Sequence, residues 1–567
     1  MKQSFLSILF LLLPMLAMAS GVEINGVYYY LYSNLNTNTR TAEVTSHPQK
    51  YTGDVVIPES VTYEGVEYSV TAIGDYAFDW NGNLNSIVMP SSITRIGNYA
   101  FHDCGKLTSV VIPENVIAIG DYAFCTCSEL QSIIIPNNVK SIGMAAFYGC
   151  THAKGLVLGS SLETIGSNAF YDCEQIPSVT IPSSLISIGE NAFGSCFELE
   201  KVWISDIAAW CQIDFADPGA NPTSYSYNLY DKNGFEITNL IIPDGVTSIG
   251  NYAFYSLSEV VSVTIPNSVQ SIGKAAFSGC NQLKTITIPD GVTAIQDQTF
   301  YQCSLLNTVT MGKGVKSIGE KAFYNCSSLY EINLPQSVTS IGFMAFSRCG
   351  KLKSIDISSV TSMENAAFSD CASLANVVLS DKLTIIPGYA FQHCTALSKI
   401  RIPAKVESLG DFAFGDCDNL QSVSVLATIP PNAYENAFSK YNIPLIVPDG
   451  LQTTYQSVSP WNKFTSFGGL CQKPIIVLEN GILRFSCDTE GVEYHYTISD
   501  NNLEGGVGNN IALSFTVRVY ATKEGCLDSE EAVSEISPSN GLVGDVNGDG
   551  VVNAADVVKV TNIIMGE

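Results

Sequence analysis

Residues 107–127, "LTSVVIPENVIAIGDYAFCTC", contain the pattern that determines the fold. Val110 and Ile112 alternate with Val111, so the first two share one face of a short strand and the third points to the opposite face. Pro113 ends this strand because it has no N–H to donate to a neighbouring strand. The stretch therefore begins with one short strand that has an apolar inner face.

The second half of the same stretch predicts two further elements. Val116 and Ile119 belong to a second short extended piece, and Gly120 permits a tight turn. We expect the segment that starts at Tyr122 and includes Phe124 to be a short helical or 3₁₀ turn. Three such elements close one coil.

The coil recurs along most of the chain. If the phenylalanine of each coil is taken as a marker, eleven of the fourteen intervals are 23 residues, one is 22, one is 24 and one is 61. The fifteen markers are Phe78, Phe101, Phe124, Phe147, Phe170, Phe193, Phe254, Phe277, Phe300, Phe323, Phe346, Phe368, Phe391, Phe414 and Phe438. A repeat of such regular length predicts a solenoid, in which each coil buries its apolar face against its neighbours.

The repeat pattern L-x-x-V-x-I-P-x-x-V-x-x-I-G-x-x-A-F-x-x-C resembles the BspA-like leucine-rich repeats of bacterial surface proteins, from about Asp54 to Leu451. Residues 205–234, "SDIAAWCQIDFADPGANPTSYSYNLYDKNG", are similar to an insertion found in that family. The resemblance implies a leucine-rich repeat solenoid and a role in adhesion, through binding to host matrix proteins or to other cells.

The expected organisation has six parts. They are a signal peptide (1–19), an N-terminal β cap (20–70), the leucine-rich repeat solenoid (71–451, with an insertion at 205–239), a C-terminal cap (452–470), an immunoglobulin-like β-sandwich (471–538) and a dockerin-like calcium-binding segment (541–567). The caps are expected because the end coils of a solenoid would otherwise expose their core.

Twelve coils carry a cysteine three residues after the marker phenylalanine. They are Cys104, Cys127, Cys150, Cys173, Cys196, Cys280, Cys303, Cys326, Cys349, Cys371, Cys394 and Cys417. These residues could form disulfides, bind a metal or fill the core. Leu257 replaces the cysteine in an interior coil, which favours an apolar, space-filling position. Some of the remaining cysteines, Cys125, Cys211, Cys471, Cys487 and Cys526, could pair in an oxidising medium.

The residue ten positions after each marker is expected to face outward, and this outward column changes character along the chain. It is apolar in the first coils and polar later: Val88, Val111, Ile134, Val157, Thr180, Trp203, Thr264, Thr287, Thr310, Asn333, Asp356, Val378, Arg401 and Ser424. One interpretation is that β-branched residues simply favour strands. The other is a partner groove on the N-terminal half, bounded by exposed aromatic residues of the insertion. Its candidate ligand-binding residues are Val88, Val111, Ile134, Val157, Trp203 and Trp210, with Tyr225, Tyr227 and Tyr230 nearby.

The charge and the N-terminus restrict location and partners. The formal net charge of −26 repels nucleic-acid backbones and anionic lipid. Lys2, the apolar run from Phe5 to Leu16 and the small-x-small site at 17–19 predict a secretory signal peptide. No later apolar run is long enough to span a membrane. We therefore expect a secreted or cell-surface protein.

The C-terminal segment differs from the repeats. Residues 471–538 alternate apolar and polar side chains between turn residues, which predicts a small antiparallel β-sandwich. The tail "GDVNGDGVVNAADVVKVTNIIMGE" resembles one half of a dockerin, with Gly550 at a sharp turn. Its expected Ca²⁺ ligands are Asp545, Asn547, Asp549, Val551 (through its carbonyl), Asn553 and Asp556.

Two non-catalytic functions agree with these features. The first is an adhesin-like binding protein that engages a protein or glycan through its sheet face. The second is a component of an extracellular polysaccharide-degrading assembly, attached to a cohesin-like partner through the dockerin-like tail. The sequence contains no recognisable catalytic motif, so we expect no enzyme activity; a third alternative places an active site in the insertion.

Overall fold

The computed structural model describes residues 16–17, 21–34, 37–479, 482–487, 489, 491–500, 515–523 and 526–536. The predicted signal peptide, apart from residues 16–17, and the predicted calcium-binding segment lie outside these residues. The chain divides into two units, Met1–Leu352 and Lys353–Glu567, which are described separately.

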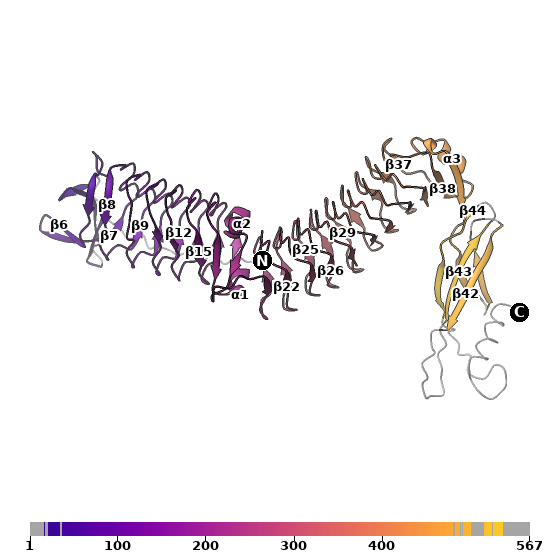
Figure 1. Cartoon of the computed structure of the whole chain (residues 1–567), viewed down its shortest axis with the longest axis horizontal. Helices are drawn as coiled ribbons and strands as arrows, with labels where there is room; N and C mark the ends of the chain where they lie inside the picture. The colour runs from indigo at the N-terminus through magenta and orange to yellow at the C-terminus, as the bar shows by residue number, and fades with distance from the viewer. Residues whose placement is uncertain are drawn as a thin grey trace, which may run out of the picture. The chain divides into compact units, whose positions relative to one another are not determined.

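The first unit begins with a mixed β-sheet. Its strands are β1 (Leu16–Ala17), β2 (Val22–Ile24), β3 (Val27–Asn34), β4 (Thr39–Thr45), β6 (Ser60–Tyr63) and β7 (Val66–Ile73). Strands β2, β3 and β4 pair antiparallel, whereas β4 and β7 pair parallel. Strand β7 then pairs parallel with β9 (Arg95–Ile96), a strand of the coils. The sheet therefore continues directly into the stacked coils (Figure 1).

Most regular coils contribute two short strands to two parallel ladders; the coil of residues 107–127 contributes only one, at 118–119, so the strand predicted around Val111 is not formed there. The first ladder contains the V-x-I strands β5 (Gly53–Val56), β8 (Leu84–Val88), β11 (Ile133–Ile134), β13 (Leu156–Val157), β15 (Ser178–Ile181), β17 (Lys201–Ile204), β20 (Asn239–Ile241), β22 (Ser262–Thr264), β24 (Thr285–Thr287), β26 (Thr308–Thr310) and β28 (Glu331–Ile332). The second contains β9, β10 (Ala118–Ile119), β12 (Ser141–Ile142), β14 (Thr164–Ile165), β16 (Ser187–Ile188), β21 (Ser248–Ile249), β23 (Ser271–Ile272), β25 (Ala294–Ile295), β27 (Ser317–Ile318) and β29 (Ser340–Ile341). Paired residues are offset by 23 positions, as in Ile134 with Val157 and Ile142 with Ile165.

The third side of the regular coil is a turn, so the predicted helical or 3₁₀ segment is wrong there. Tyr122 and Thr126 have φ values of 56° and 57°, a left-handed conformation that a right-handed helix cannot contain. The amides of Tyr122, Phe124 and Thr126 instead donate to carbonyls of the next coil, at 2.7, 2.7 and 2.6 Å. The coils are thus hydrogen-bonded to each other on this side as well.

The marker phenylalanines are buried and stack in files, which in the first unit run from Phe78 to Phe193 before the insertion and from Phe254 after it. Phe101 is fully buried, and its ring lies 5.0 Å from that of Phe78 and 4.9 Å from that of Phe124. In the second unit, Phe391 is stacked between Phe368 and Phe414, at 5.4 Å from each. This confirms the coil register that the phenylalanine spacing predicts.

The cysteine ladder is also part of the core. All twelve cysteines are buried as thiols rather than as disulfides, so the space-filling interpretation is confirmed for this structure. The thiols have a polar contact that the sequence did not predict: the Sγ of Cys303 donates to the carbonyl of Phe277 at 3.1 Å, and that of Cys326 donates to Phe300 at 3.1 Å. Burial raises the pKa of Cys303 to about 12, so its thiol stays protonated at neutral pH.

The insertion forms an irregular layer of the same stack. Its elements are α1 (Ile207–Cys211), β18 (Asp214–Phe215), the 3₁₀ helix η1 (Pro218–Ala220), α2 (Thr223–Ser226) and β19 (Leu229–Tyr230). Strand β18 pairs with β16 of the second ladder, and β19 pairs with β17 of the first. Asp206 and Asp217 cap α1 and η1 by accepting hydrogen bonds from the amides of Ala208 and Ala220, each at 2.8 Å.

The second unit continues with coils of the same kind. The first-ladder strands are β30 (Ser354–Asp356), β32 (Asn376–Val378), β34 (Lys399–Ile402), β36 (Ser422–Val425), β38 (Pro444–Pro448) and β39 (Ser466–Leu470); the second-ladder strands are β31 (Ser362–Met363), β33 (Ile385–Ile386), β35 (Ser408–Leu409) and β37 (Asn432–Ala433). Between β38 and β39 lie α3 (Gln452–Gln456) and the 3₁₀ helix η2 (Trp461–Lys463). Tyr455 and Trp461 are buried there and donate to the carbonyls of Ala427 and Pro431.

Antiparallel strands follow these coils in the second unit. Strand β40 (Ile475–Glu479) pairs with β41 (Ile482–Ser486), and β43 (Phe515–Thr522) pairs with both β42 (Glu493–Asp500) and β45 (Ala532–Ile536). Strand β44 (Cys526–Leu527) pairs parallel with β39. The immunoglobulin-like sandwich remains a prediction.

Candidate ligand-binding face

Five aliphatic side chains form an exposed row on the first ladder of the first unit. We call this the apolar row; its members are Val56, Val88, Val111, Ile134 and Val157, with exposed fractions of 66, 56, 80, 56 and 55%. A water-facing strand position ordinarily carries polar residues, so five consecutive aliphatic side chains on neighbouring coils are unusual.

The strand register pairs four of these side chains, and Val111 belongs to the coil between the two pairs. Val56 is paired with Val88, and Ile134 is paired with Val157. Ile133, which precedes Ile134, is 1% exposed and points into the core. The period of two along each strand thus separates the row from the core.

Val56 and Ile241 were missed by the sequence analysis. Neither residue stands ten positions after a marker phenylalanine, since Val56 precedes the first marker and Ile241 follows the insertion. Ile241 is 62% exposed and is paired with Thr264. The signal that could have found them is the pattern x-I-P, because each residue directly precedes an Ile-Pro pair, as Val111 does.

The row is interrupted at Thr180 and is followed by aromatic side chains. Trp203 is half-buried and is paired with Tyr230 of the insertion, and the two ring centroids lie 6.2 Å apart. Burial is the main cause that raises the pKa of Tyr230. The two aromatic side chains therefore lie side by side beyond the row, although Trp203 is half-buried rather than exposed as expected.

Trp210 is a correction to the predicted site. It is 1% exposed, so it cannot touch a ligand at the surface of this structure. Its indole Nε1 donates to the carbonyl of Ala253 at 2.7 Å, and its ring packs 5.1 Å from that of Phe215. The physical reason is that the insertion replaces a coil and must supply its own core side chains.

Two other tyrosines of the insertion lie in or directly after the short helix α2 rather than on the strand face. Tyr225 is in α2, where its ring approaches that of Phe197 at 6.2 Å. Tyr227 ends α2 in a left-handed conformation and is 53% exposed. Neither belongs to the apolar row.

The surroundings of the apolar row carry little charge. The outward side chains two residues before Val111 and Ile134 are Ser109 and Ser132. At the N-terminal end, the Ser86 hydroxyl donates to Asp54 Oδ1 at 2.7 Å. A partner can therefore cover the middle of the row without burying an ionised group, whose desolvation would oppose binding.

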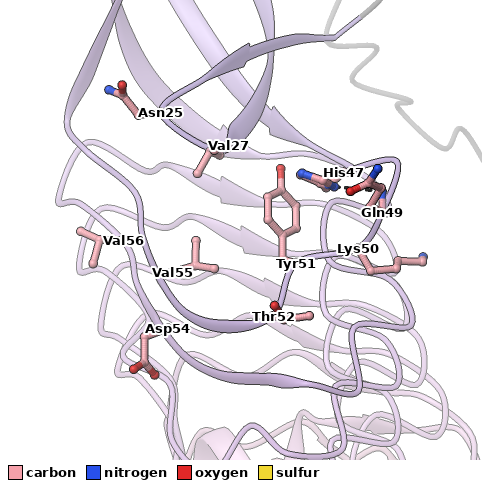
Figure 2. Close-up of a pocket in the computed structure, with 11 residues that line it drawn as sticks. Asn25, Val27, His47, Gln49, Lys50, Tyr51, Thr52, Asp54, Val55 and Val56 are labelled. Atoms are coloured by element: carbon pink, nitrogen blue, oxygen red, sulfur yellow. Dashed lines mark hydrogen bonds between the residues drawn. The ribbon is translucent and has the colours of Figure 1, made fainter.

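A pocket of about 480 Å³ adjoins the N-terminal end of the row (Figure 2). It is lined by Asn25, Gly26, Val27, His47, Gln49, Lys50, Tyr51, Thr52, Asp54, Val55 and Val56. Val56 thus belongs both to the apolar row and to the rim of the pocket. Figure 2 shows that the lining comes from the turn between β2 and β3 and from the segment leading into β5.

The later coils carry a polar equivalent of the same face. Thr264, Thr287 and Thr310 are exposed at the positions that correspond to Val111 and Ile134. Thr287 and Thr310 are themselves paired across neighbouring strands. The apolar row is therefore specific to the N-terminal coils, although the backbone is the same throughout.

The part of the chain that the structure describes has no group of three or more His, Cys, Asp or Glu side chains placed to hold a metal ion. None of its helices combines the length and the apolar character needed to cross a bilayer. The expected calcium ligands Asp545 to Asp556 lie outside it.

Several solved structures of bacterial proteins are similar to this chain. A leucine-rich repeat protein of Bacteroides ovatus is 26% identical over 71% of this chain and 94% of its own, with a TM-score of 0.41. A leucine-rich cell surface protein of Faecalibacterium prausnitzii is 23% identical over 79% and 94%, with a TM-score of 0.29. The pneumococcal vaccine antigen PcpA is 18% identical over 79% and 97%, with a TM-score of 0.36.

Family models give a direct assignment, whereas no curated protein matches the sequence. The model described as "BspA type Leucine rich repeat region (6 copies)" matches residues 66–207, 224–349 and 316–443, which together are more than half of the chain. The match includes every regular coil that carries the cysteine ladder. This chain is a member of the BspA-type leucine-rich repeat family.

Proposed function

We propose that this protein is an exported, non-catalytic binding protein whose apolar row docks an extracellular protein. The observation that carries the proposal is the row itself: five exposed aliphatic side chains on adjacent coils. With strands about 4.8 Å apart, the row is about 20 Å long, which suits one side of a protein–protein contact. The signal-peptide pattern at 1–19 supports export.

The chemistry of the row favours a protein over a glycan. Valine and isoleucine offer neither hydrogen-bonding groups nor a flat ring, and a sugar needs such groups to replace the water around its hydroxyls. A protein surface with aliphatic or aromatic side chains gains free energy from covering the row, by about 25 cal/mol for each Å² of apolar area removed from water.

The test is a double substitution in the row with a matched control. Val111→Lys with Ile134→Lys places two charges in the row, and Thr287→Lys with Thr310→Lys places them on the equivalent polar face. Both pairs are exposed, so we expect each to change the free energy of unfolding by less than about 1 kcal/mol. Binding is measured on an array of immobilised matrix proteins beside plant and mucin glycans.

We expect at least one matrix protein to bind the native chain and the Thr287/Thr310 control equally. The Val111/Ile134 variant should bind it at least about 100-fold more weakly, since two lysines would lose their hydration in the contact. Equal binding by all three proteins, or binding to glycans alone, would remove the proposal.

The C-terminal tail supports a second, separate proposal. The oxygen-bearing residues from Asp545 to Asp556 have the spacing that wraps one Ca²⁺, with Gly550 at the sharp turn. Attachment of the protein to an extracellular polysaccharide-degrading assembly through this tail is the alternative function. A pull-down with and without residues 541–567 distinguishes the two: loss of partners on truncation favours assembly, and their retention favours docking through the coils.

A further inference from the structure

The pocket at the N-terminal cap has a different chemistry from the apolar row. Its exposed lining is mostly polar and includes Asn25, Gln49, Lys50, Thr52 and Asp54. Its volume of about 480 Å³ lies within the range of small-ligand sites. Protein docking on the apolar row uses only Val56 of this lining, so the pocket requires an explanation of its own.

The wall of the pocket is held rigid by tyrosine contacts. The Tyr51 hydroxyl donates to the carbonyl of Thr45 and accepts from the amide of Tyr28, both at 2.9 Å. The His47 ring lies edge-on between the rings of Tyr28 and Tyr51, at 4.9 and 5.1 Å. Tyr51 is 4% exposed, and burial raises the pKa of its hydroxyl well above the ordinary value. The site is therefore formed before any ligand binds.

The hydrogen-bonding groups of the pocket include both donors and acceptors. The Gln49 amide N–H donates to His47 Nδ1 at 2.9 Å, so the neutral imidazole carries its proton on Nε2 and can donate there. The side chains of Asn25 and Gln49 each offer a carbonyl and an NH₂ group, and the Thr52 hydroxyl can do both. A ligand rich in hydroxyl groups matches this mixture, because each hydroxyl also donates and accepts.

The charge of the pocket selects a neutral ligand. Lys50 and Asp54 are the two ionised side chains that line it, and their charges cancel. The chain as a whole carries a formal charge of −26, which disfavours sulfated or sialylated ligands.

The exposed indole of Trp80 directly follows Asp79, a residue that is hydrogen-bonded to Lys50. Lys50 Nζ donates to the carbonyl of Asp79 at 2.5 Å, and the next residue, Trp80, is 62% exposed. The Trp80 ring stands at 82° to the His102 ring, 5.5 Å away, and His102 Nδ1 is 2.8 Å from Asp79 Oδ1. The indole is thus held in place with much of its surface in water, as a flat apolar platform suited to the C–H face of a sugar ring.

We propose that the pocket formed by Asn25, Gln49, Thr52 and Asp54, extended by the Trp80 ring, binds a neutral oligosaccharide. This site shares only Val56 with the protein-docking row. Asn25 and Asp54 lie on one side of Tyr51 and Gln49 on the other (Figure 2), so they would hydrogen-bond different sugars of the ligand, and the indole would stack on a further sugar.

The test uses the full chain and defined probes. Binding of neutral gluco-, xylo-, manno- and N-acetylglucosamine oligosaccharides is measured by saturation-transfer NMR and calorimetry, beside sialylated and sulfated oligosaccharides. Tryptophan emission gives a second readout: Trp80 is 62% exposed, whereas Trp203 is half-buried and Trp210 and Trp461 are buried. We expect a neutral oligosaccharide to bind and to shift this emission to shorter wavelength.

Asn25→Gly with Gln49→Ala removes amide groups without straining the turn, since Asn25 has a φ of 52°. The matched control is Asn38→Gly, an exposed asparagine with the same φ of 52° in the next hairpin. The double variant should weaken binding about tenfold or more, whereas the control and the Val111/Ile134 variant should bind as the native chain does.

Three results would overturn the proposal. They are the absence of binding by every neutral oligosaccharide, unchanged affinity in the Asn25/Gln49 variant, and preference for the sialylated or sulfated probes. Trp80→Asn tests the platform separately and should abolish the emission shift and lower the affinity for longer oligosaccharides.

Discussion

Replacement of one ladder thiol tests how the coils are held together. Cys303 is fully buried, and its Sγ donates to the Phe277 carbonyl at 3.1 Å. Cys303→Ala removes a group about the size of a methylene, at a cost of about 1 kcal/mol, and also removes a weak hydrogen bond worth about 0.5–1 kcal/mol. We therefore expect Cys303→Ala to lower the local stability by about 2 kcal/mol.

Cys303→Ser separates the two contributions. Its hydroxyl can still donate to the Phe277 carbonyl, so we expect this variant to be no less stable than Cys303→Ala, at a cost of about 1 kcal/mol. If the thiol served only as an apolar filler, burying a hydroxyl would instead make serine clearly worse than alanine.

Native-state hydrogen exchange measures these differences within the affected coils. The amides of Phe300 and Phe323 donate to the carbonyls of Ala322 and Ala345, each at 2.8 Å, so their exchange reports opening of the stack there. A serine variant less stable than the alanine variant by more than about 1 kcal/mol would refute the donor role. Wild-type exchange in the alanine variant would refute tight packing around the thiol.

Two further outcomes follow from the structure, and a third follows from the sequence of the C-terminal tail. Burial raises the pKa of Cys303 from 9.0 to about 12, so between these pH values the folded state keeps a proton that the unfolded state loses. The contribution of each such thiol to stability is complete below pH 9 and declines between pH 9 and about 12, by ~1.4 kcal/mol per pH unit. Urea titrations across this pH range should show a smaller decline in stability for Cys303→Ala than for the native chain. Trp210→Phe should lower the stability by about 1–2 kcal/mol through its lost hydrogen bond, and Trp210→Ala by about 3–5 kcal/mol. The measurement is hydrogen exchange of the Gly250 amide, which donates to the Cys211 carbonyl at 2.8 Å. Unchanged exchange would contradict a core role for Trp210. Asp545→Ala with Asp549→Ala should abolish Ca²⁺ binding in calorimetry, and native affinity in that variant would exclude the calcium loop.

The sequence predicted those features that depend on the repeat alone. A fixed period places equivalent residues of neighbouring coils side by side, so the file of phenylalanines, the buried thiols and the outward position of Val111 follow from the spacing. The same logic failed where the spacing is interrupted. Trp210 was expected at the surface because the insertion was treated as a loop, whereas the insertion completes a layer and buries that ring.

Features made by contacts between dissimilar segments could not be predicted from the sequence. The pocket depends on Asn25, in the turn between β2 and β3, and on Asp54, in strand β5, and no sequence repeat relates these two residues. The left-handed turns at Tyr122 and Thr126 arise because the amides of this side bond to the next coil, and that preference has no local sequence signal comparable to glycine. The partner of Cys303 Sγ is likewise a backbone group of the preceding coil.

Hydrogen-exchange mapping of the complex with a bound matrix protein tests the docking proposal most directly. Docking on the apolar row predicts slowed exchange in five peptides, covering residues 54–57, 86–89, 109–112, 132–135 and 155–158, with no change at residues 285–288 on the polar face. Slowed exchange confined to other coils, or to residues 541–567, would contradict it.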